Sequence, residues 1–112
     1  MSIDVTTAPL ADAGPFPGAE PGSARTAELV LYEDERMQAG VWEVTPGRFD
    51  AVHGAYVEVM HFIAGEATIT AADGEVHEVR AGVALTVPSG WRGHWDVRAT
   101  VRKTYVIVRD PE

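Results

Sequence analysis

Residues 40–65, GVWEVTPGRFDAVHGAYVEVMHFIAG, decide the predicted fold of this 112-residue chain. Two runs of β-forming residues, 41–44 and 56–63, predict two strands joined by a long turn. The sequence at 45–47 ends the first run, because proline fixes φ and glycine allows a positive φ. Ala-Gly at 64–65 ends the second run.

Glu58 does not fit the second run on hydrophobic grounds, because an unpaired carboxylate is costly to bury. Alternate side chains of a strand point to opposite faces, which places Glu58 on one face with Tyr56, Met60 and Phe62. Glu58 is therefore the first candidate for chemistry, as a metal ligand or a general acid or base. The alternative is a structural carboxylate held by a hydrogen bond or a cation.

The composition predicts one domain and argues against anionic partners. The chain has 46% hydrophobic residues, enough for a single core, and a net charge of −8 with no basic run, which argues against nucleic acid and anionic membranes. The absence of cysteine excludes disulfides, thiolate catalysis and Cys-based zinc sites. No signal peptide or apolar run of about 18 residues is seen, so a cytoplasmic protein is expected.

Residues 1–25 contain four of the seven prolines and differ from the rest in composition. This segment is predicted to be a flexible tail, or an extended arm anchored by Leu10 and Phe16 on the domain or on a second subunit. Residues 26–112 form the predicted barrel domain.

Short β-type runs separated by turn residues occupy the rest of the chain. Asp73-Gly74 is a strong hairpin signal, and no window has a helical apolar period. The predicted runs are 27–32, 37–44, 56–63, 66–71, 75–80, 83–87, 91–97 and 100–108. They predict an antiparallel all-β jelly roll, another barrel or a sandwich. Exposed strand edges predict a homodimer, in which the first core strand or the N-terminal arm packs on its partner.

Two spaced motifs, Gly47…Glu58-x6-Gly65 and Gly82-x5-Pro88-x-Gly90, resemble the two sequence motifs of the cupins. More narrowly, the segments GVWEVTPGRF, PSGWRGHW and VRKTYVIV are similar to small single-domain cupins of the domain-of-unknown-function 861 (Cupin_3) group. That group is similar to the cupin domain of ethanolamine-utilisation protein Q and has been loosely linked with ureidoglycine aminohydrolase. The resemblance covers about residues 27–108 and implies a cupin-type double-stranded β-helix, a jelly-roll barrel.

The resemblance also raises the question of a metal. Metal-binding cupins carry two histidines before the Glu of the first motif and a third after the second Gly of Pro-x-Gly. Only His53 is present here in the first motif, and Gly93 stands at the position of the third histidine, with His94 one residue late. A divalent transition metal (Mn, Fe, Ni or Zn) held by His53, Glu58 and His94 would need loop geometry to correct both spacings. The sequence therefore favours no bound metal.

Large apolar side chains define a predicted ligand pocket around Glu58, because a small barrel can hold one small ligand. The predicted ligand-binding residues are Trp42, Tyr56, Met60, Phe62, Trp91, Trp95 and Tyr105. Simple core packing is the alternative for most of these rings.

The final run predicts a partner for Glu58. Lys103 and Tyr105 fall on the predicted inner face of residues 100–108. A lysine inside a barrel needs an anion, so Lys103 and Glu58 are predicted to share the interior, directly paired or separated by a ligand or water. Such a pair could act as proton donor and acceptor, and is the predicted catalytic pair. Alternatively, Lys103 extends along its strand to solvent.

Three functions are consistent with these patterns. The leading one is a small-molecule-binding cupin with its pocket around Glu58. The second is a metal-dependent enzyme acting on a small polar metabolite, such as a ureido compound or an amine. The third is a non-catalytic accessory or structural cupin domain.

Overall fold

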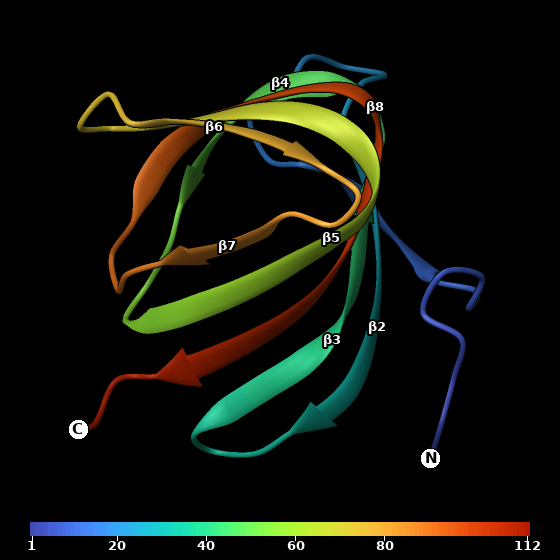
Figure 1. Ribbon diagram of the computed structural model, residues 1–112, viewed down its shortest axis with the longest axis vertical. Helices are drawn as coiled ribbons and strands as arrows, with labels where there is room; N and C mark the ends of the chain where they lie inside the picture. The colour runs from blue at the N-terminus through green and yellow to red at the C-terminus, as the bar shows by residue number, and fades with distance from the viewer.

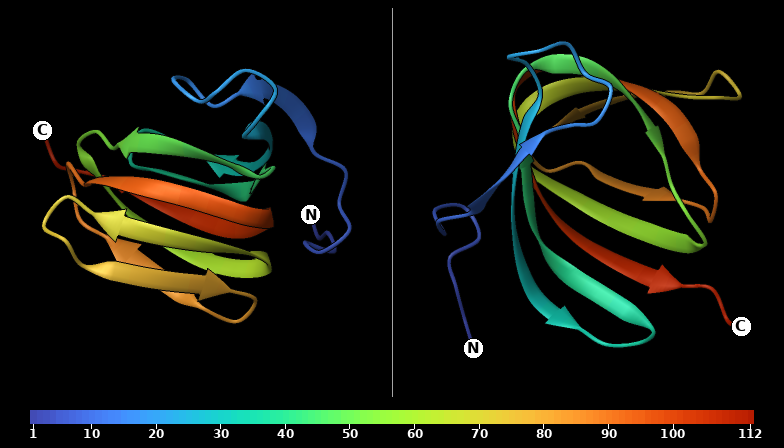
Figure 2. Two further views of the ribbon diagram at one scale, coloured as in Figure 1. Left: turned by 90° about the horizontal axis from the view of Figure 1, so that it is seen from above. Right: turned by 180° about the vertical axis from the view of Figure 1, so that it is seen from behind.

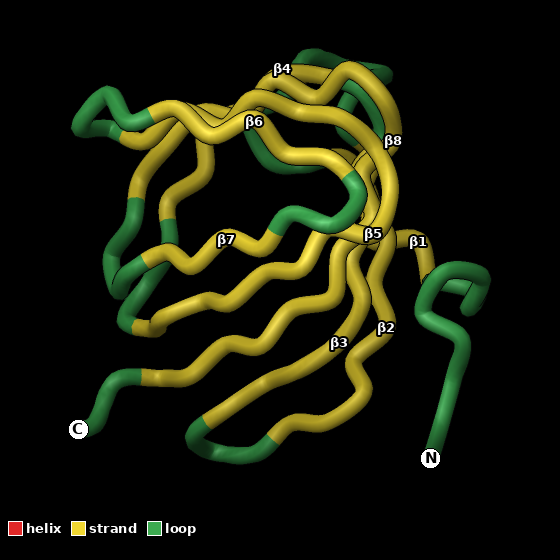
Figure 3. Tube along the Cα trace, in the orientation of Figure 1, coloured by secondary structure: helices red, strands yellow, loops and turns green.

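The computed structural model describes residues 1–112 and contains strands and loops only, which confirms the all-β prediction (Figure 3). The strands are β1 (Ala11–Pro15), β2 (Arg25–Glu33), β3 (Met37–Val44), β4 (Gly47–Val52), β5 (Tyr56–Ala71), β6 (Val76–Arg80), β7 (Ala84–Val87) and β8 (Arg92–Arg109). No helix that could span a membrane is present.

β5 and β8 form the frame of the barrel, because each runs through both of its sheets. Residues 56–64 of β5 pair with residues 102–109 of β8, and residues 66–71 of β5 pair with residues 93–99 of β8. The first half of β5 and the second half of β8 belong to a sheet ordered β1-β2-β3-β8-β5-β7. Their other halves form the sheet β4-β8-β5-β6. Figures 1 and 2 show both long strands bending from one sheet into the other.

Gly65 bends β5 where the sequence predicts that it ends. The φ of Gly65 is +98°, and a Cβ at this position would lie 2.3 Å from the carbonyl oxygen of Thr100 on β8. The pairing register shifts on both sides of this point. The prediction of two separate strands at 56–63 and 66–71 is therefore wrong, because Gly65 provides a bend within one continuous strand. The runs 91–97 and 100–108 are likewise parts of one strand, β8.

The predicted long turn between β3 and β5 is wrong, because most of it forms the strand β4. The predicted end of the first run at Val44 is confirmed, but only Thr45 and Pro46 separate it from residues 47–52, which form a strand paired with the first half of β8, with Phe49 opposite Trp95. Phe49 and Ala51 are buried while Arg48 and Asp50 are exposed. This alternation is the pattern of a strand with one buried face.

The predicted Asp73-Gly74 hairpin is confirmed between β5 and β6. The Ala71 amide donates to the Glu75 carbonyl oxygen and the Gly74 amide to the Ala71 carbonyl oxygen, each over 2.8 Å. Gly74 has the positive φ, +93°, that the turn requires.

The N-terminal segment packs on its own chain. β1 is the edge strand beside β2, a position at which a sheet tolerates proline. The ring of Phe16 stacks on that of Phe49, with centroids 4.0 Å apart. The Arg102 guanidinium donates to the carbonyl oxygens of Val5 and Ala8 over 3.1 and 3.0 Å. Of the two predicted anchors, Phe16 thus contacts the barrel of the same chain.

The core lies between the two sheets and is built by the inward faces of β5 and β8. Its largest fully buried members are Phe62, Met60 and Ile69. On the opposite, outer face of the same two strands, four valines form cross-strand neighbours: Val57 opposite Val108, and Val59 opposite Val106. We call these four residues the valine patch; two of them, Val59 and Val108, are exposed.

Candidate functional site

A cavity of about 230 Å³ lies inside the barrel, lined by thirteen residues. β2, β3, β4, β5, β8, the chain following β1 and the loop between β4 and β5 all contribute to its walls. The lining residues are Phe16, Glu28, Trp42, Phe49, Ala51, Val52, His53, Tyr56, Glu58, Trp95, Lys103, Tyr105 and Ile107. Six of the thirteen lining residues are phenylalanine, tryptophan or tyrosine, and only three, Glu28, Glu58 and Lys103, belong to types that are charged at neutral pH.

Glu58 and Lys103 form a buried ion pair at this cavity. The Lys103 Nζ lies 2.7 Å from the Glu58 Oε2, and the two residues are only 6% and 5% exposed. The pair forms because β5 and β8 are neighbours and both residues belong to inward-facing positions of their strands. The predicted contact is confirmed, and Lys103 does not extend to solvent.

Aromatic rings and sulfur surround the Lys103 ammonium where water would otherwise solvate it. Its Nζ lies 4.7 Å from the ring centroid of Trp42 and 5.4 Å from that of Trp95. The Met60 Sδ is 3.3 Å away. Cation–π attraction and the carboxylate together offset the loss of hydration, which a buried ammonium could not tolerate alone.

His53, on the loop between β4 and β5, is the third polar residue of the site and lies beside Glu58. Its ring stacks on Tyr56 and meets the edge of Trp91, with centroids 5.3 and 5.2 Å away. Burial lowers the pKa of His53, and the nearby Lys103 lowers it further, although the negative charge of Glu58 opposes both. The ring is therefore neutral at neutral pH.

His53 brings an unused hydrogen-bonding atom to the site. Its Nδ1 is buried without a hydrogen-bond partner and lies 3.8 Å from the Glu58 Oε1. Since the other oxygen of Glu58 contacts Lys103, a ligand group beside these two atoms could hydrogen bond to both. The indole Nε1 of Trp95 is a second buried polar atom without a partner.

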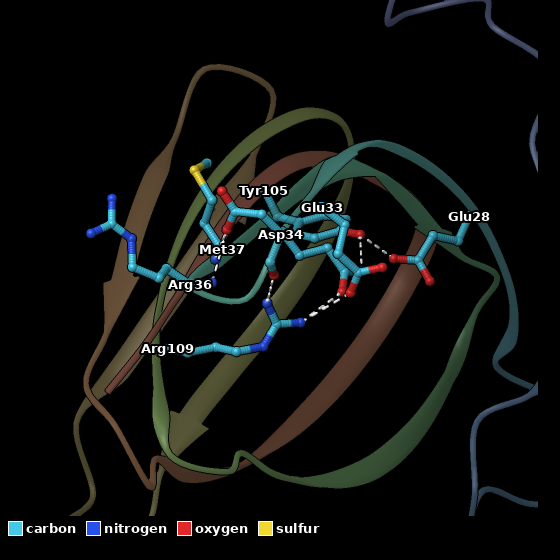
Figure 4. A network of polar contacts seen from close by, with 8 residues as sticks. Glu28, Glu33, Asp34, Arg36, Met37, Tyr105 and Arg109 are labelled. Carbon is cyan, nitrogen blue, oxygen red and sulfur yellow. Dashed lines mark hydrogen bonds and ion pairs between the residues drawn. The ribbon is translucent and has the colours of Figure 1, made fainter. Parts of the chain in front are cut away.

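A hydrogen-bond network fixes the Tyr105 and Glu28 side of the cavity (Figure 4). The Tyr105 hydroxyl donates to the Glu28 Oε2 and accepts from the Gln38 Nε2 over 3.0 Å. The Gln38 Oε1 in turn accepts from Arg109 over 3.4 Å, and Arg109 pairs with Glu33 at 3.0 Å. Burial, with the hydrogen bond to Glu28 as the next cause, raises the pKa of Tyr105 well above its ordinary range, so its hydroxyl stays protonated.

The structure brings only part of the predicted ligand-binding set to the cavity. Trp42, Tyr56, Trp95 and Tyr105 line it. The other three residues do not: Met60 and Phe62 are buried in the core behind it, and Trp91 packs against His53 and lines a different hollow, beside β6 and β7.

Sequence analysis missed Glu28 and Phe49 as lining residues, and it placed Phe16 only as an anchor. For Phe49, the polar–apolar alternation of residues 47–52 was the available signal. For Glu28, the signal was its place in an otherwise apolar run, the same argument that singled out Glu58.

The residues present do not fit the three-ligand metal centre considered from the sequence. His94 lies on the outer face of β8, exposed, with its Nδ1 2.8 Å from the Asp50 Oδ1. The next residue, Trp95, points inward, because one step along a strand reverses the side chain. His53 and Glu58 come together, but Lys103 takes the place of a third ligand. No group of three or more His, Cys, Asp or Glu side chains is arranged to hold a metal ion.

Solved structures with the same architecture come from several bacteria. The EutQ protein of Clostridium difficile is 22% identical, with a TM-score of 0.78 over 96% of this chain and 86% of that chain. A putative ethanolamine utilization protein Q from Salmonella typhimurium LT2 is 25% identical, with a TM-score of 0.70 over 88% of this chain and 79% of that chain.

A predicted oxalate decarboxylase from Thermotoga maritima is 13% identical, with a TM-score of 0.75 over 98% of this chain and all of that chain, and at this identity shares the fold alone. No curated protein sequence matches the chain. The family profile described as EutQ-like cupin domain matches residues 31–105, which include both long strands up to Tyr105 and most of the cavity wall. The chain therefore belongs to the family of EutQ-like cupin domains.

Proposed function

We propose that this cupin domain binds a small organic molecule in the barrel cavity, against the Glu58–Lys103 pair. The supporting observation is that two polar atoms of cavity-lining residues have no hydrogen-bond partner. These buried atoms are His53 Nδ1 and Trp95 Nε1. Buried polar atoms are normally hydrogen-bonded, so these two atoms leave hydrogen-bonding capacity that a ligand or an ordered water can complete.

The size and lining of the cavity favour a small metabolite. Its volume of about 230 Å³ is below the roughly 300–1,000 Å³ of pockets for drug-sized ligands. Nine of its thirteen lining residues are hydrophobic, and the few polar groups converge from β2, β5 and β8. A purely structural domain would gain stability from an apolar filling, whereas this cavity retains an ion pair and a free imidazole nitrogen.

The tryptophans provide an internal test by NMR. In a ¹⁵N-labelled sample, Trp42 and Trp95 report on the cavity, while Trp91 lies outside its lining and serves as a control. We expect a ligand from a chemically broad panel of small metabolites to shift the indole N–H signals of Trp42 and Trp95. The Trp95 signal moves downfield when the ligand accepts its hydrogen bond, and the Trp91 signal shifts less, because its ring contacts the cavity wall only through His53.

The opposite results would overturn the proposal. Binding that shifts Trp91 or outer-face amides alone would place the ligand elsewhere, and a panel without any binder would remove small-molecule binding. Single Trp→Phe variants assign the three signals.

A catalytic role for the pair is the second candidate. Glu58 has one oxygen bound to Lys103 and the other facing a neutral imidazole, so it can accept a proton from a bound ligand while Lys103 balances the charge. The test uses a ligand found by the NMR screen, incubated in D₂O. Deuterium incorporation that Glu58→Gln abolishes, with binding retained, supports catalysis, and no exchange in the wild-type protein contradicts it.

A further inference from the structure

Glu28 is the carboxylate at the cavity that no cation neutralises. It lies on β2 opposite Trp42 of β3 and is half-buried. Its only side-chain hydrogen bond comes from the Tyr105 hydroxyl (Figure 4). No lysine, arginine or histidine side chain lies within 4.0 Å of it, whereas Glu58 is paired with Lys103.

The charges lining the cavity sum to −1. Glu58 and Lys103 cancel one another, His53 is neutral, and no arginine lines the cavity. Tyr105 stays protonated and is thus a neutral donor to Glu28. Glu28 is left as the single uncompensated charge, facing walls of low polarity, where electrostatic interactions are strong.

The rest of the wall suits a cation and opposes an anion. Six aromatic rings line the cavity, and their negative faces attract positive charge, as the position of Lys103 near Trp42 and Trp95 already demonstrates. An anionic ligand would meet two carboxylates and would have to compete with Glu58 for Lys103. A neutral apolar ligand would exclude water from Glu28 without replacing its hydrogen bonds.

We propose that the cavity selects a small organic ammonium ion, with Glu28 as its counter-ion and the aromatic rings as its walls. This inference rests on the proposed small-molecule function and adds the chemical class of the ligand. The ammonium group donates to the Glu28 carboxylate, and the organic part fills the apolar remainder of the cavity. Glu28 is the residue that determines ligand charge, a role separate from that of the Glu58–Lys103 pair.

The test compares three probes of similar size and different charge: n-propylammonium, n-propanol and propionate, in a sodium phosphate buffer that contains no amine. Affinities come from NMR titrations followed on the Trp42 and Trp95 indoles. We expect n-propylammonium to bind about tenfold or more tightly than n-propanol, because both can donate a hydrogen bond to the Glu28 carboxylate but only the ammonium forms an ion pair with it. Propionate should bind most weakly.

Two glutamine variants separate the local role of Glu28 from overall charge. Glu28→Gln keeps an acceptor for Tyr105 but removes the charge, and should remove most of the preference for n-propylammonium over n-propanol, leaving only the attraction of the aromatic rings for a cation. Glu33→Gln removes a carboxylate from the same strand, paired with Arg109 and outside the cavity lining, and should leave the preference unchanged. Urea unfolding of both variants verifies that they are folded as stably as the wild type.

The remaining outcomes overturn the inference in distinguishable ways. If n-propanol or propionate binds more tightly and still shifts the cavity indoles, ammonium selection is wrong and the small-molecule function stands. If Glu28→Gln leaves the ammonium preference intact, or Glu33→Gln removes it equally, Glu28 is not the counter-ion. If none of the probes binds, the ammonium class is rejected, and the broad metabolite panel decides the proposed function separately.

Discussion

Removing one member of the Glu58–Lys103 pair should destabilise the protein far more than removing both. In Lys103→Met, the Glu58 carboxylate stays buried without its cation; in Glu58→Gln, the Lys103 ammonium stays buried without its anion. Breaking a buried pair in this way costs about 3–5 kcal/mol. The double variant holds no buried charge and leaves an amide with incomplete hydrogen bonding, which costs about 1–3 kcal/mol.

The expected coupling follows from these magnitudes. The two single losses sum to about 6–10 kcal/mol, so the double variant should be more stable than additivity predicts by at least about 3 kcal/mol. The assay is urea unfolding of the four proteins followed by far-UV circular dichroism at neutral pH. Sodium sulfate in every sample keeps the single variants folded, because it strengthens apolar burial, and total stability is only about 5–15 kcal/mol.

The chain supplies a matched control on its surface. Arg48 and Asp96 pair across β4 and β8 at 3.6 Å, with side chains 75% and 36% exposed. The same cycle with Arg48→Met and Asp96→Asn should give a coupling of about 1 kcal/mol or less. Additivity within about 0.5 kcal/mol for the Glu58–Lys103 cycle, as little as for the control, would refute the reasoning that desolvation makes the buried pair interdependent.

Three further predictions concern the bend, the histidine and the outer face. Gly65→Ala should destabilise the protein by about 2 kcal/mol more than Gly82→Ala, because both glycines have a positive φ but only Gly65 meets backbone within 3 Å; equal losses in urea unfolding would contradict this. Since burial lowers the pKa of His53, the unfolded chain takes up its proton first, and the free energy of unfolding should fall as the pH drops from about 7 through the ordinary histidine range near 6.5 to about 5. This fall should be smaller in His53→Gln than in the exposed-site control His61→Gln, and parallel pH profiles would count against the burial argument. We also propose that the valine patch pairs two copies of the chain: sedimentation should give a dimer for the wild type and a monomer for Val59→Glu, and a monomeric wild type at micromolar concentration would exclude it.

The Glu58–Lys103 contact could be predicted from the sequence because two local rules point to the same answer. Strand alternation places Glu58 on the same face as Met60, and Lys103 on the same face as Tyr105. Because an unpaired buried charge is costly, each of the two charged side chains then requires a partner of opposite charge. The outward position of His94 follows from the same alternation, once the register of β8 is known. These arguments need only the period of a strand and the sign of the charges.

Other features depend on contacts between distant segments. The local pattern at residues 64–65 is that of a strand end, and only the carbonyl of Thr100 beside Gly65 turns it into a corner. In β2, Leu29 and Leu31 would favour an inward face of their own, yet Glu28 on the other face lines the cavity. The register with β3 decides this orientation, and neither strand encodes it alone.

The continuity of β5 and β8 through both sheets also constrains how a ligand could enter the cavity. Since β5 and β8 belong to both sheets, the sheets cannot separate without breaking the hydrogen bonds between residues 56–71 and 93–109. The two sheets therefore have no hinge between them, and only the loops and termini lie outside the strands. Phe16, on the chain after β1, and His53, on the β4–β5 loop, both lie at the cavity and outside the strands. Substitutions at these two positions should change the rates of ligand entry and exit, while substitutions in the strands should change chiefly how tightly the ligand is held.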